Sequence, residues 1–250
     1  MKNILSIFLI SLIFSTTLFA EDVPDLNRAE KYQAKIPVEV VKEIKLPKGY
    51  HEGLYWDGKN VWVCNGEDGD IWIVDPSQGK VIDRITPIGT FTEGITAYGD
   101  GTYWLTDWNS KKLYRVKIDS GAMISDYEIS LDPAHPAGVL WTGDHLYVIT
   151  WTRGIGTKYH LMELDDREHM HKKMIIKRIH EPAHMAWDGS YLWITSWYTP
   201  LVYKVDVNNF KVLGSFKSPV SDTTGIVWDG EYFWVTGTKS DLYKIKLLPE

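Results

Sequence analysis

The sequence predicts an all-β fold, a five-bladed β-propeller with four antiparallel strands in each blade. Three observations support this prediction. A short unit recurs five times, and its copies begin 41 to 46 residues apart, at Gly53, Gly94, Gly138, His184 and Gly225. An aromatic strand follows each copy, and 13% of the whole chain is aromatic, which is typical of β-structure. A period of about 40–45 residues that holds four short strands is typical of a propeller blade.

The repeated unit reads as a strand followed by a tight turn. Its clearest copies are residues 53–58, 138–143, 184–189 and 225–230, and residues 94–101 form a looser copy with one inserted residue. Each copy ends in Asp-Gly or a similar dipeptide, which favours a two-residue hairpin. The unit is therefore expected to form the first strand of each blade and the turn into the second.

Three further strands are expected in each period. The second strand is aromatic and apolar, at 61–63, 103–105, 146–148, 192–194 and 233–235. The third ends near an acidic turn, as at 71–75 and 202–206, and the fourth follows it, as at 80–85 and 211–216. The tryptophans that recur at equivalent positions are expected to pack between blades: Trp56, Trp141, Trp187, Trp228, Trp62, Trp104, Trp193 and Trp234.

The two ends of the repeat region predict how the ring closes. The fifth copy stops after its third strand, at residues 242–247, whereas residues 38–44 resemble a fourth strand with no blade of its own. Pairing these two segments would remove two exposed sheet edges. The count therefore predicts five blades rather than six or seven.

The N-terminal residues have the features of a secretory signal. Lys2 precedes an apolar run over residues 4–14, and Ala20 is followed by two acidic residues. We expect a signal peptide over residues 1–20, a polar lead-in over 21–35 with a short helix around 27–34, and one propeller domain over 36–250. The mature protein is expected to be periplasmic or secreted, with no later segment that spans a membrane.

Composition excludes several classes of protein. A single cysteine, Cys64, rules out a disulfide scaffold and is expected to be a buried small hydrophobe. The formal net charge of −6 gives no broad basic surface for a nucleic acid. We expect a monomer without a nucleic-acid partner.

Equivalent positions that differ between blades predict the site. The start of the first strand and the end of the second lie side by side in an antiparallel hairpin, so both should border the central channel. The residues just before each copy are His51-Glu52, Thr92-Glu93, Pro136-Ala137, Pro182-Ala183 and Thr223-Thr224. Those just after each second strand are Gly66, Trp108, Trp151, Trp197 and Thr238. We therefore expect two carboxyl groups, one or two histidines and three indoles at one mouth.

Each of these residues also has a structural interpretation. The three indoles could pack between blades instead of lining a pocket. Glu52 and Glu93 could satisfy backbone amides at a turn, although two acids facing one channel would raise a pKa in a way that suits proton transfer. His184 replaces a glycine, so it is either a hydrogen-bonded core histidine or a functional one.

A metal site is not expected. His51, Glu52, Glu93 and His184 include metal-ligating types, but no spacing typical of a metal site supports them. Neither a metal nor an organic cofactor is expected. The insert over residues 153–158 follows Trp151 and contains two glycines, so it is interpreted as a lip over the site.

Three segments resemble a known family. Phe91-Thr92-Glu93-Gly94-Ile95-Thr96 is similar to the motif F-G-E-G, then I or L, then T; residues 225–229 with 234–237, and 50–54, are similar to further motifs of the same family. This family is the glutamine cyclotransferases, the plant-type glutaminyl cyclases with a five-bladed propeller. The resemblance runs from about Val38 to Leu247. It implies conversion of N-terminal glutamine to pyroglutamate with release of ammonia, with Glu93 as the catalytic glutamate and Trp108 and Trp197 in the pocket.

The chain departs from the family pattern at four places. Ala137 stands where the family usually has tryptophan, and residues 182–185 stand where it has L-N-E-L. Thr238 occupies the position of a lysine, and Glu52 that of a glutamine. The proposed proton-transfer residue is therefore kept, whereas several polar residues that would orient the substrate are not.

Two hypotheses from different classes remain open. As an enzyme, the protein would cyclise N-terminal glutamine, with Glu93 moving a proton in a partly dry pocket. Its substrate, a small molecule or peptide with a free N-terminal amine, would contact Glu52, Phe91, Trp108, Trp151, His184 and Trp197. As a binding module, the same mouth would hold an amine or a cation by cation–π attraction. A lyase or lactonase is a third possibility, because propellers host many functions.

Overall fold

A computed structural model describes residues 34–154, 157–164, 170–176 and 178–249. Within these ranges every regular element is a β-strand, and the strands form five antiparallel sheets of four strands each. The prediction of an all-β, five-bladed propeller is confirmed. No helix in the described ranges is long and apolar enough to cross a membrane. The expected signal peptide over 1–20 and nearly all of the expected helix around 27–34 lie outside the described residues.

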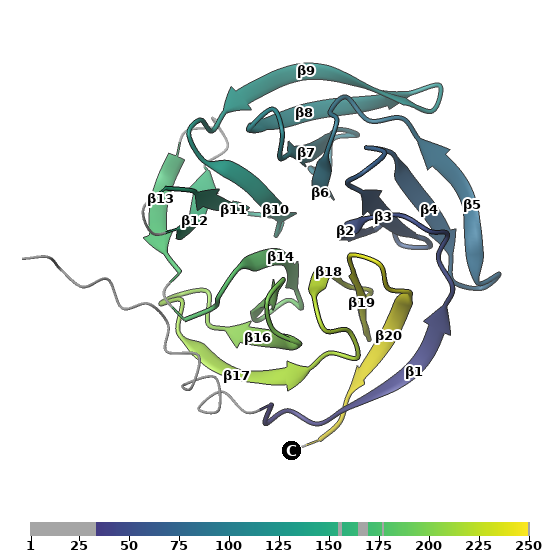
Figure 1. The fold of residues 1–250 in the computed structure, drawn as a ribbon, viewed down its shortest axis with the longest axis vertical. Helices are drawn as coiled ribbons and strands as arrows, with labels where there is room; N and C mark the ends of the chain where they lie inside the picture. The colour runs from purple at the N-terminus through teal and green to yellow at the C-terminus, as the bar shows by residue number, and fades with distance from the viewer. Residues whose placement is uncertain (1–33, 155–156, 165–169, 177, 250) are drawn as a thin grey trace, which may run out of the picture.

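The five sheets surround a central axis, with one strand of each sheet innermost (Figure 1). Blade 1 contains β2 (His51–Trp56), β3 (Val61–Asn65), β4 (Ile71–Asp75) and β5 (Lys80–Ile85). Blade 2 contains β6 (Thr92–Ala97), β7 (Tyr103–Asp107), β8 (Lys112–Asp119) and β9 (Ala122–Ser130). Blade 3 contains β10 (His135–Trp141), β11 (Leu146–Thr152), β12 (Lys158–Leu164) and β13 (Met170–Ile175).

The last two blades follow the same order, with one exchange. Blade 4 contains β14 (Pro182–Trp187), β15 (Leu192–Ser196), β16 (Leu201–Val205) and β17 (Val212–Lys217). Blade 5 contains β18 (Thr223–Trp228), β19 (Phe233–Gly237), β20 (Leu242–Leu247) and, as its outer strand, β1 (Val38–Ile44). The fourth strand of the last blade therefore comes from the beginning of the described chain.

The pairing of β1 with β20 closes the ring. The two strands run antiparallel, from Val38 opposite Leu247 to Ile44 opposite Leu242. Ile44 is buried in an apolar cluster with Trp234 of blade 5 and Leu54 of blade 1. The predicted closure is confirmed, and β1 covers an edge of β20 that would otherwise expose unpaired backbone groups.

The hydrophobic core consists of five clusters, one between each pair of neighbouring blades. Four blades have a tryptophan in the second strand, and each of these residues lies in one of the clusters: Trp62, Trp104, Trp193 and Trp234. The tryptophan at the end of the first strand packs against a cluster: Trp56, Trp141, Trp187 and Trp228. The predicted packing role of these eight residues is confirmed. Cys64 is buried in the cluster between blades 1 and 2, as predicted.

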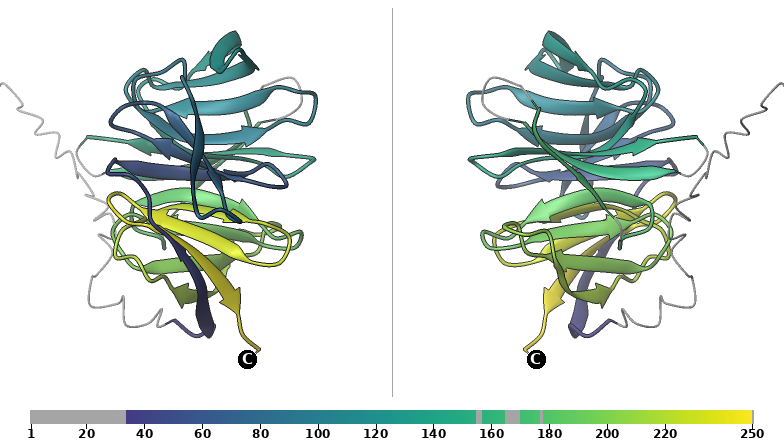
Figure 2. Two further views of the ribbon diagram at one scale, coloured as in Figure 1. Left: turned by 90° about the vertical axis from the view of Figure 1, so that its right-hand side faces the viewer. Right: turned by 90° about the vertical axis from the view of Figure 1, so that its left-hand side faces the viewer.

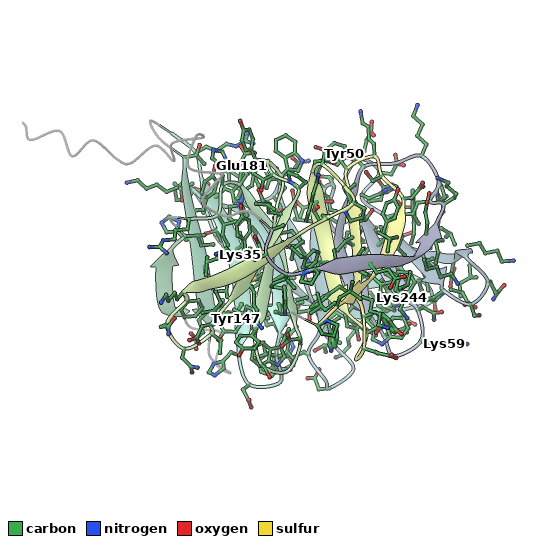
Figure 3. All side chains as sticks on the ribbon, turned by 90° about the horizontal axis from the view of Figure 1, so that it is seen from below. Lys35, Tyr50, Lys59, Tyr147, Glu181 and Lys244 are labelled. Carbon is green, nitrogen blue, oxygen red and sulfur yellow. The ribbon has the colours of Figure 1, made fainter. Side chains whose placement is uncertain are left out.

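The two faces of the ring differ in what they carry. The strands run across the thickness of the ring, from one face to the other (Figure 2). Tyr50 and Glu181 lie on one face, which we call the mouth face (Figure 3). Lys59 and Tyr147 lie on the opposite face, which carries the first hairpin turn of each blade and which we call the turn face.

Candidate functional site

The innermost strand of every blade has a β-bulge near its mouth end. In blade 2 Thr92 pairs with Asp107 and Gly94 pairs with Thr106, so Glu93 is the extra residue between them. The pairing is irregular at the equivalent place in the other four blades, which in blade 1 includes Glu52. A bulge redirects a side chain and is common beside active sites. Local backbone geometry therefore sets both glutamates apart from the regular alternation of their strands.

Glu93 lies in a partly dry, negatively charged environment. Burial and, after it, the nearby carboxylate of Asp107 raise the pKa of its carboxyl group to about 8, against the opposing effect of the Arg153 guanidinium. Asp107 is held in place because it accepts hydrogen bonds from the backbone N–H groups of Thr90 and Phe91, each at 2.7 Å. A carboxyl group with a pKa near neutrality can both take up and release a proton at working pH.

Glu52 is the second acid of the mouth. It is 5% exposed, and its pKa lies well above the ordinary value because of burial and then because of the charges of Glu93 and Asp222. The same three carboxyl groups, together with burial, raise the pKa of Tyr50 to about 12. The two predicted glutamates therefore lie close enough to influence each other, and Asp222 lies beside them.

Indoles and a guanidinium form one wall of the mouth. Trp108 makes an edge-to-face contact with Trp151, with ring centroids 5.3 Å apart, and it stacks on His135 at 4.5 Å. The Arg153 guanidinium lies 4.9 Å above the ring of Trp108. The indole N–H of Trp151 donates to the carbonyl of Pro182 at 2.8 Å, which fixes its ring. Arg153 belongs to the insert that was expected to form a lip, of which residues 155–156 lie outside the described ranges.

Tyr50, Phe91 and Trp197 form a second group of aromatic side chains. The rings of Tyr50 and Phe91 meet edge to face at 5.7 Å. The indole N–H of Trp197 donates a hydrogen bond to the Tyr50 hydroxyl. Trp197 is 41% exposed, so it stands at the outer edge of the mouth rather than deep inside it.

His184 occupies the axis of the ring. A Cβ atom on Gly53 would lie 2.5 Å from Nε2 of His184, and one on Gly138 would lie 2.7 Å from its Cα. The imidazole therefore fills the space that the glycines of other blades leave empty. Burial lowers the pKa of His184 to about 4, so the ring is neutral at physiological pH. Nδ1 donates to the carbonyl of Ile226 at 3.1 Å, and Nε2 has no hydrogen-bond partner among the described residues.

One predicted histidine does not reach the mouth. His51 hydrogen-bonds to the carbonyls of Ser240 and Pro47, and its ring packs on Trp72 at 5.1 Å. The side chain of Thr92, at the equivalent position of blade 2, bonds to the carbonyl of Gly69. The prediction that this row of residues faces the mouth is wrong, because alternate residues of a strand point in opposite directions.

The same alternation adds four residues that were not predicted, Tyr50, His135, Glu181 and Asp222, to the row that contains the predicted Phe91. The position three before the start of each copy holds Tyr50, Phe91, His135, Glu181 and Asp222, of which Tyr50 and Glu181 are seen on the mouth face in Figure 3. Glu181 has a φ of 47°, a left-handed conformation that is uncommon for a residue with a side chain. Strained residues of this kind concentrate at functional sites. The carboxyl groups of Glu52, Glu93 and Asp222 thus act on Tyr50, and Glu181 adds a fourth carboxyl group on the same face.

The arrangement suits a ligand that carries an amine. An ionised carboxyl group attracts an ammonium group, a neutral one can still accept its hydrogen bond, and the faces of indole rings attract cations. Within the described ranges no group of three histidine, cysteine or acidic side chains is placed to hold a metal ion.

The raised pKa of Glu93 predicts that stability depends on pH. In the folded protein this carboxyl keeps its proton up to about pH 8, whereas the ordinary value of 4.5 applies after unfolding. Between those values the folded state binds more protons, so the free energy of unfolding should fall as pH rises. The free energy of unfolding, measured with urea at several pH values in this window, should depend less steeply on pH in Glu93→Gln than in the wild type. Equal slopes in both proteins would contradict a buried, protonated Glu93.

Comparison with known proteins supports the fold. No protein-family model matches the chain, and no curated protein matches it by sequence. Among solved structures, it is similar to the glutaminyl cyclase of Myxococcus xanthus, with a TM-score of 0.67 and 13% identity over 84% of this chain and 96% of that one.

Propellers with other named activities are also similar. The virginiamycin B lyase of Staphylococcus aureus has a TM-score of 0.51 and 14% identity over 85% of this chain and 100% of that one. The PQQ-bound aldose sugar dehydrogenase of Streptomyces coelicolor has a TM-score of 0.57 and 11% identity over 86% and 99%. At these identities the likeness concerns the fold alone, and the chain has a glutaminyl cyclase-like β-propeller fold.

Proposed function

We propose that the protein is a glutaminyl-peptide cyclotransferase, which converts N-terminal glutamine to pyroglutamate. The observation that carries the proposal is the Glu93 carboxyl group, whose pKa is raised to about 8 inside an aromatic mouth. In the reaction, the α-amine nitrogen of the substrate bonds to the side-chain amide carbon and gives up a proton to Glu93. The bond from that carbon to the amide nitrogen then breaks, and Glu93 returns the proton so that ammonia leaves. One carboxyl group is thus sufficient for both transfers.

The other residues of the mouth bind and orient the substrate. Trp108 and Trp151 form a wall that excludes water and holds the glutamine side chain near its amine. Burial raises the pKa of Glu52 and so favours its protonated form, which can donate a hydrogen bond to the amide oxygen as negative charge develops there. Glu52 occupies the position of a glutamine in the resembling family. In this proposal it donates the hydrogen bond to the amide oxygen in a mouth that lacks the family's lysine.

Release of ammonia from a glutamine-initiated dipeptide tests the proposal directly. With the wild type, the amount of ammonia released should equal the amount of peptide whose mass has fallen by that of one ammonia molecule. The same peptide with an acetylated N-terminus should not react, because its nitrogen can no longer attack. No release from the free peptide above the uncatalysed rate would contradict the proposal.

An amine-binding module is a second candidate. Thr238 donates a hydrogen bond to Asp222 at the place where the family has a lysine, so this part of the mouth lacks that cation and carries an acid. Acids inside an aromatic wall suit an organic cation without any reaction. Quenching of tryptophan fluorescence by simple amines, together with no ammonia release, would favour this candidate.

The proposed site of action is outside the cytoplasm. The secretory features of residues 1–20 are the reason, and exported peptides with N-terminal glutamine are the proposed substrates. Detection of the protein in a periplasmic or culture fraction, and its loss from that fraction when residues 1–20 are deleted, is the expected result.

A further inference from the structure

A cavity opens on the turn face, away from the mouth, between blades 3 and 4. Its volume is about 360 Å³, within the range of small-molecule sites. Figure 3 shows Tyr147, one of its lining residues, on the face opposite Tyr50 and Glu181. The charged, aromatic and amide side chains of the lining are Asp144, His145, Tyr147, Glu163, Trp187 and Asn208.

Three other blades close the equivalent place with a hydrogen bond between an aspartate and an indole. The aspartate that begins the first turn accepts the N–H of the tryptophan in the second strand. The pairs are Asp57 with Trp62 at 2.8 Å, Asp188 with Trp193 at 2.7 Å, and Asp229 with Trp234 at 2.9 Å. The same aspartates accept backbone N–H groups of the turn, so each turn is held against its own blade.

Blade 3 has neither partner of this pair. Thr142 replaces the aspartate and Tyr147 replaces the tryptophan. The Thr142 hydroxyl bonds only locally, to the backbone of His145. The cavity therefore lies at a blade that lacks the aspartate–indole contact of blades 1, 4 and 5.

Charge at this place is also reversed relative to the two following blades. In blades 4 and 5 a lysine of the third strand faces the tryptophan and lies over a tyrosine ring: Lys204 at 3.9 Å from Tyr191, and Lys244 at 4.0 Å from Tyr232. In blade 3 the third-strand residue that pairs with Tyr147 is Glu163. In blades 4 and 5 a lysine of the blade itself therefore lies against the aromatic rings. In blade 3 a glutamate occupies the equivalent position.

Among the side chains that the structure describes, Glu163 pairs with a histidine, a weaker cation than lysine. Nδ1 of His145 lies 2.9 Å from the Glu163 carboxylate, and the Glu163 side chain is 11% exposed. An imidazole carries a positive charge only when it is protonated. A carboxylate accepts several hydrogen bonds at once, so a second cation can join this pair without displacing His145.

We propose that this cavity binds an organic cation, a guanidinium or ammonium group on a short apolar stem. The charged group pairs with Glu163 and with Asp144, and the stem packs on Trp187 and Tyr147. The ligand would thus supply from outside the cation that Lys204 and Lys244 supply from within. This site is separate from the mouth and does not depend on the proposed reaction.

Titration with a blocked amino acid tests the proposal. The probe is N-acetyl-arginine amide, whose acetyl group removes the free amine that the mouth is proposed to need. Its neutral counterpart is N-acetyl-citrulline amide, which has almost the same shape. Calorimetry should show saturable millimolar binding of the arginine compound to the wild type, and binding of the citrulline compound at least tenfold weaker.

Three variants locate the binding. Glu163→Gln should weaken binding of the arginine compound about tenfold or more, and Asp144→Asn, an exposed turn variant, by several-fold. Glu93→Gln, in the mouth, should bind as the wild type does. Thermal unfolding confirms that each variant is folded; if Glu163→Gln is not, Asp144→Asn alone decides. Absence of saturable binding, equal affinity for both compounds, or a loss in Glu93→Gln but not in the turn-face variants would overturn the proposal.

Discussion

Replacing Glu93 by glutamine should lower kcat for cyclisation by about 100- to 10,000-fold, with a small change in KM. Glutamine has nearly the same size and keeps a polar group in the mouth, so substrate binding and packing should be little affected. It cannot take up the amine proton or return one to the leaving ammonia. The loss should therefore fall on the chemical step, which separate measurement of kcat and KM by ammonia release will show.

Glu52→Gln is the matched control for this prediction. It makes the same chemical change on the equivalent bulge of blade 1, and it restores the residue that the resembling family has at this place. The amide can still donate a hydrogen bond, so kcat should stay within about tenfold of the wild type. If Glu52→Gln abolished ammonia release and Glu93→Gln did not, the roles of the two acids would be reversed.

The fold could be predicted because the same strand and turn pattern recurs in every blade, so an assignment made in one blade can be tested in the other four. The Asp-Gly turns recur at a fixed place in the period, and the strands between them are too short and too aromatic for helices. Even the closure was predictable, since residues 38–44 lacked a blade and the last blade lacked a strand. Local sequence and overall topology agree throughout, which is the expected property of a foldable repeat.

The site could be predicted only in part. Glu52, Glu93 and the indoles were found because they differ between otherwise similar blades. His51 was misplaced and Asp222 and Glu181 were missed for one reason: adjacent residues of a strand do not share a face, whereas every second residue does. Applying the alternation of side chains along a strand to the aligned repeats would have identified the whole row of residues three positions before each copy.

Two features were beyond sequence reasoning. The bulges that hold Glu52 and Glu93 have no distinctive sequence signal, since the residues around them differ from blade to blade. The approach of Arg153 to Trp108 depends on an insert that no other blade has. The charge balance around Glu93, and hence its pKa, follows from such tertiary contacts rather than from the motif that contains it.

The residues at the axis of the ring belong both to the fold and to the surroundings of the candidate site. The His184 imidazole lies against the innermost strands of the neighbouring blades, beside Gly53, Gly94 and Gly138. The neutral ring leaves Nε2 as a bare acceptor next to Gly53 and Gly94. Four of the five copies start with glycine because the innermost strands approach one another too closely for a Cβ atom.

Gly53→Ala should therefore be among the most damaging single substitutions in the chain. The added Cβ would lie 2.5 Å from the backbone carbonyl of Glu93 and 2.5 Å from Nε2 of His184. The contact with Glu93 cannot be relieved by a side-chain rotation, because its partner is the backbone of the next blade. We expect the free energy of unfolding to fall by about 3 kcal/mol or more, and Tm by about 6–12 °C.

Gly214→Ala is the control for a glycine inside a strand. A Cβ at this position meets only the side chain of Ile36, at an ordinary 3.4 Å, so its stability should change by about 0.5 kcal/mol or less. Gly53→Ala should also lower kcat, because moving the Glu93 carbonyl displaces the carboxyl group that transfers the proton. A wild-type Tm in Gly53→Ala would mean that blades 1, 2 and 4 do not meet at the axis as described.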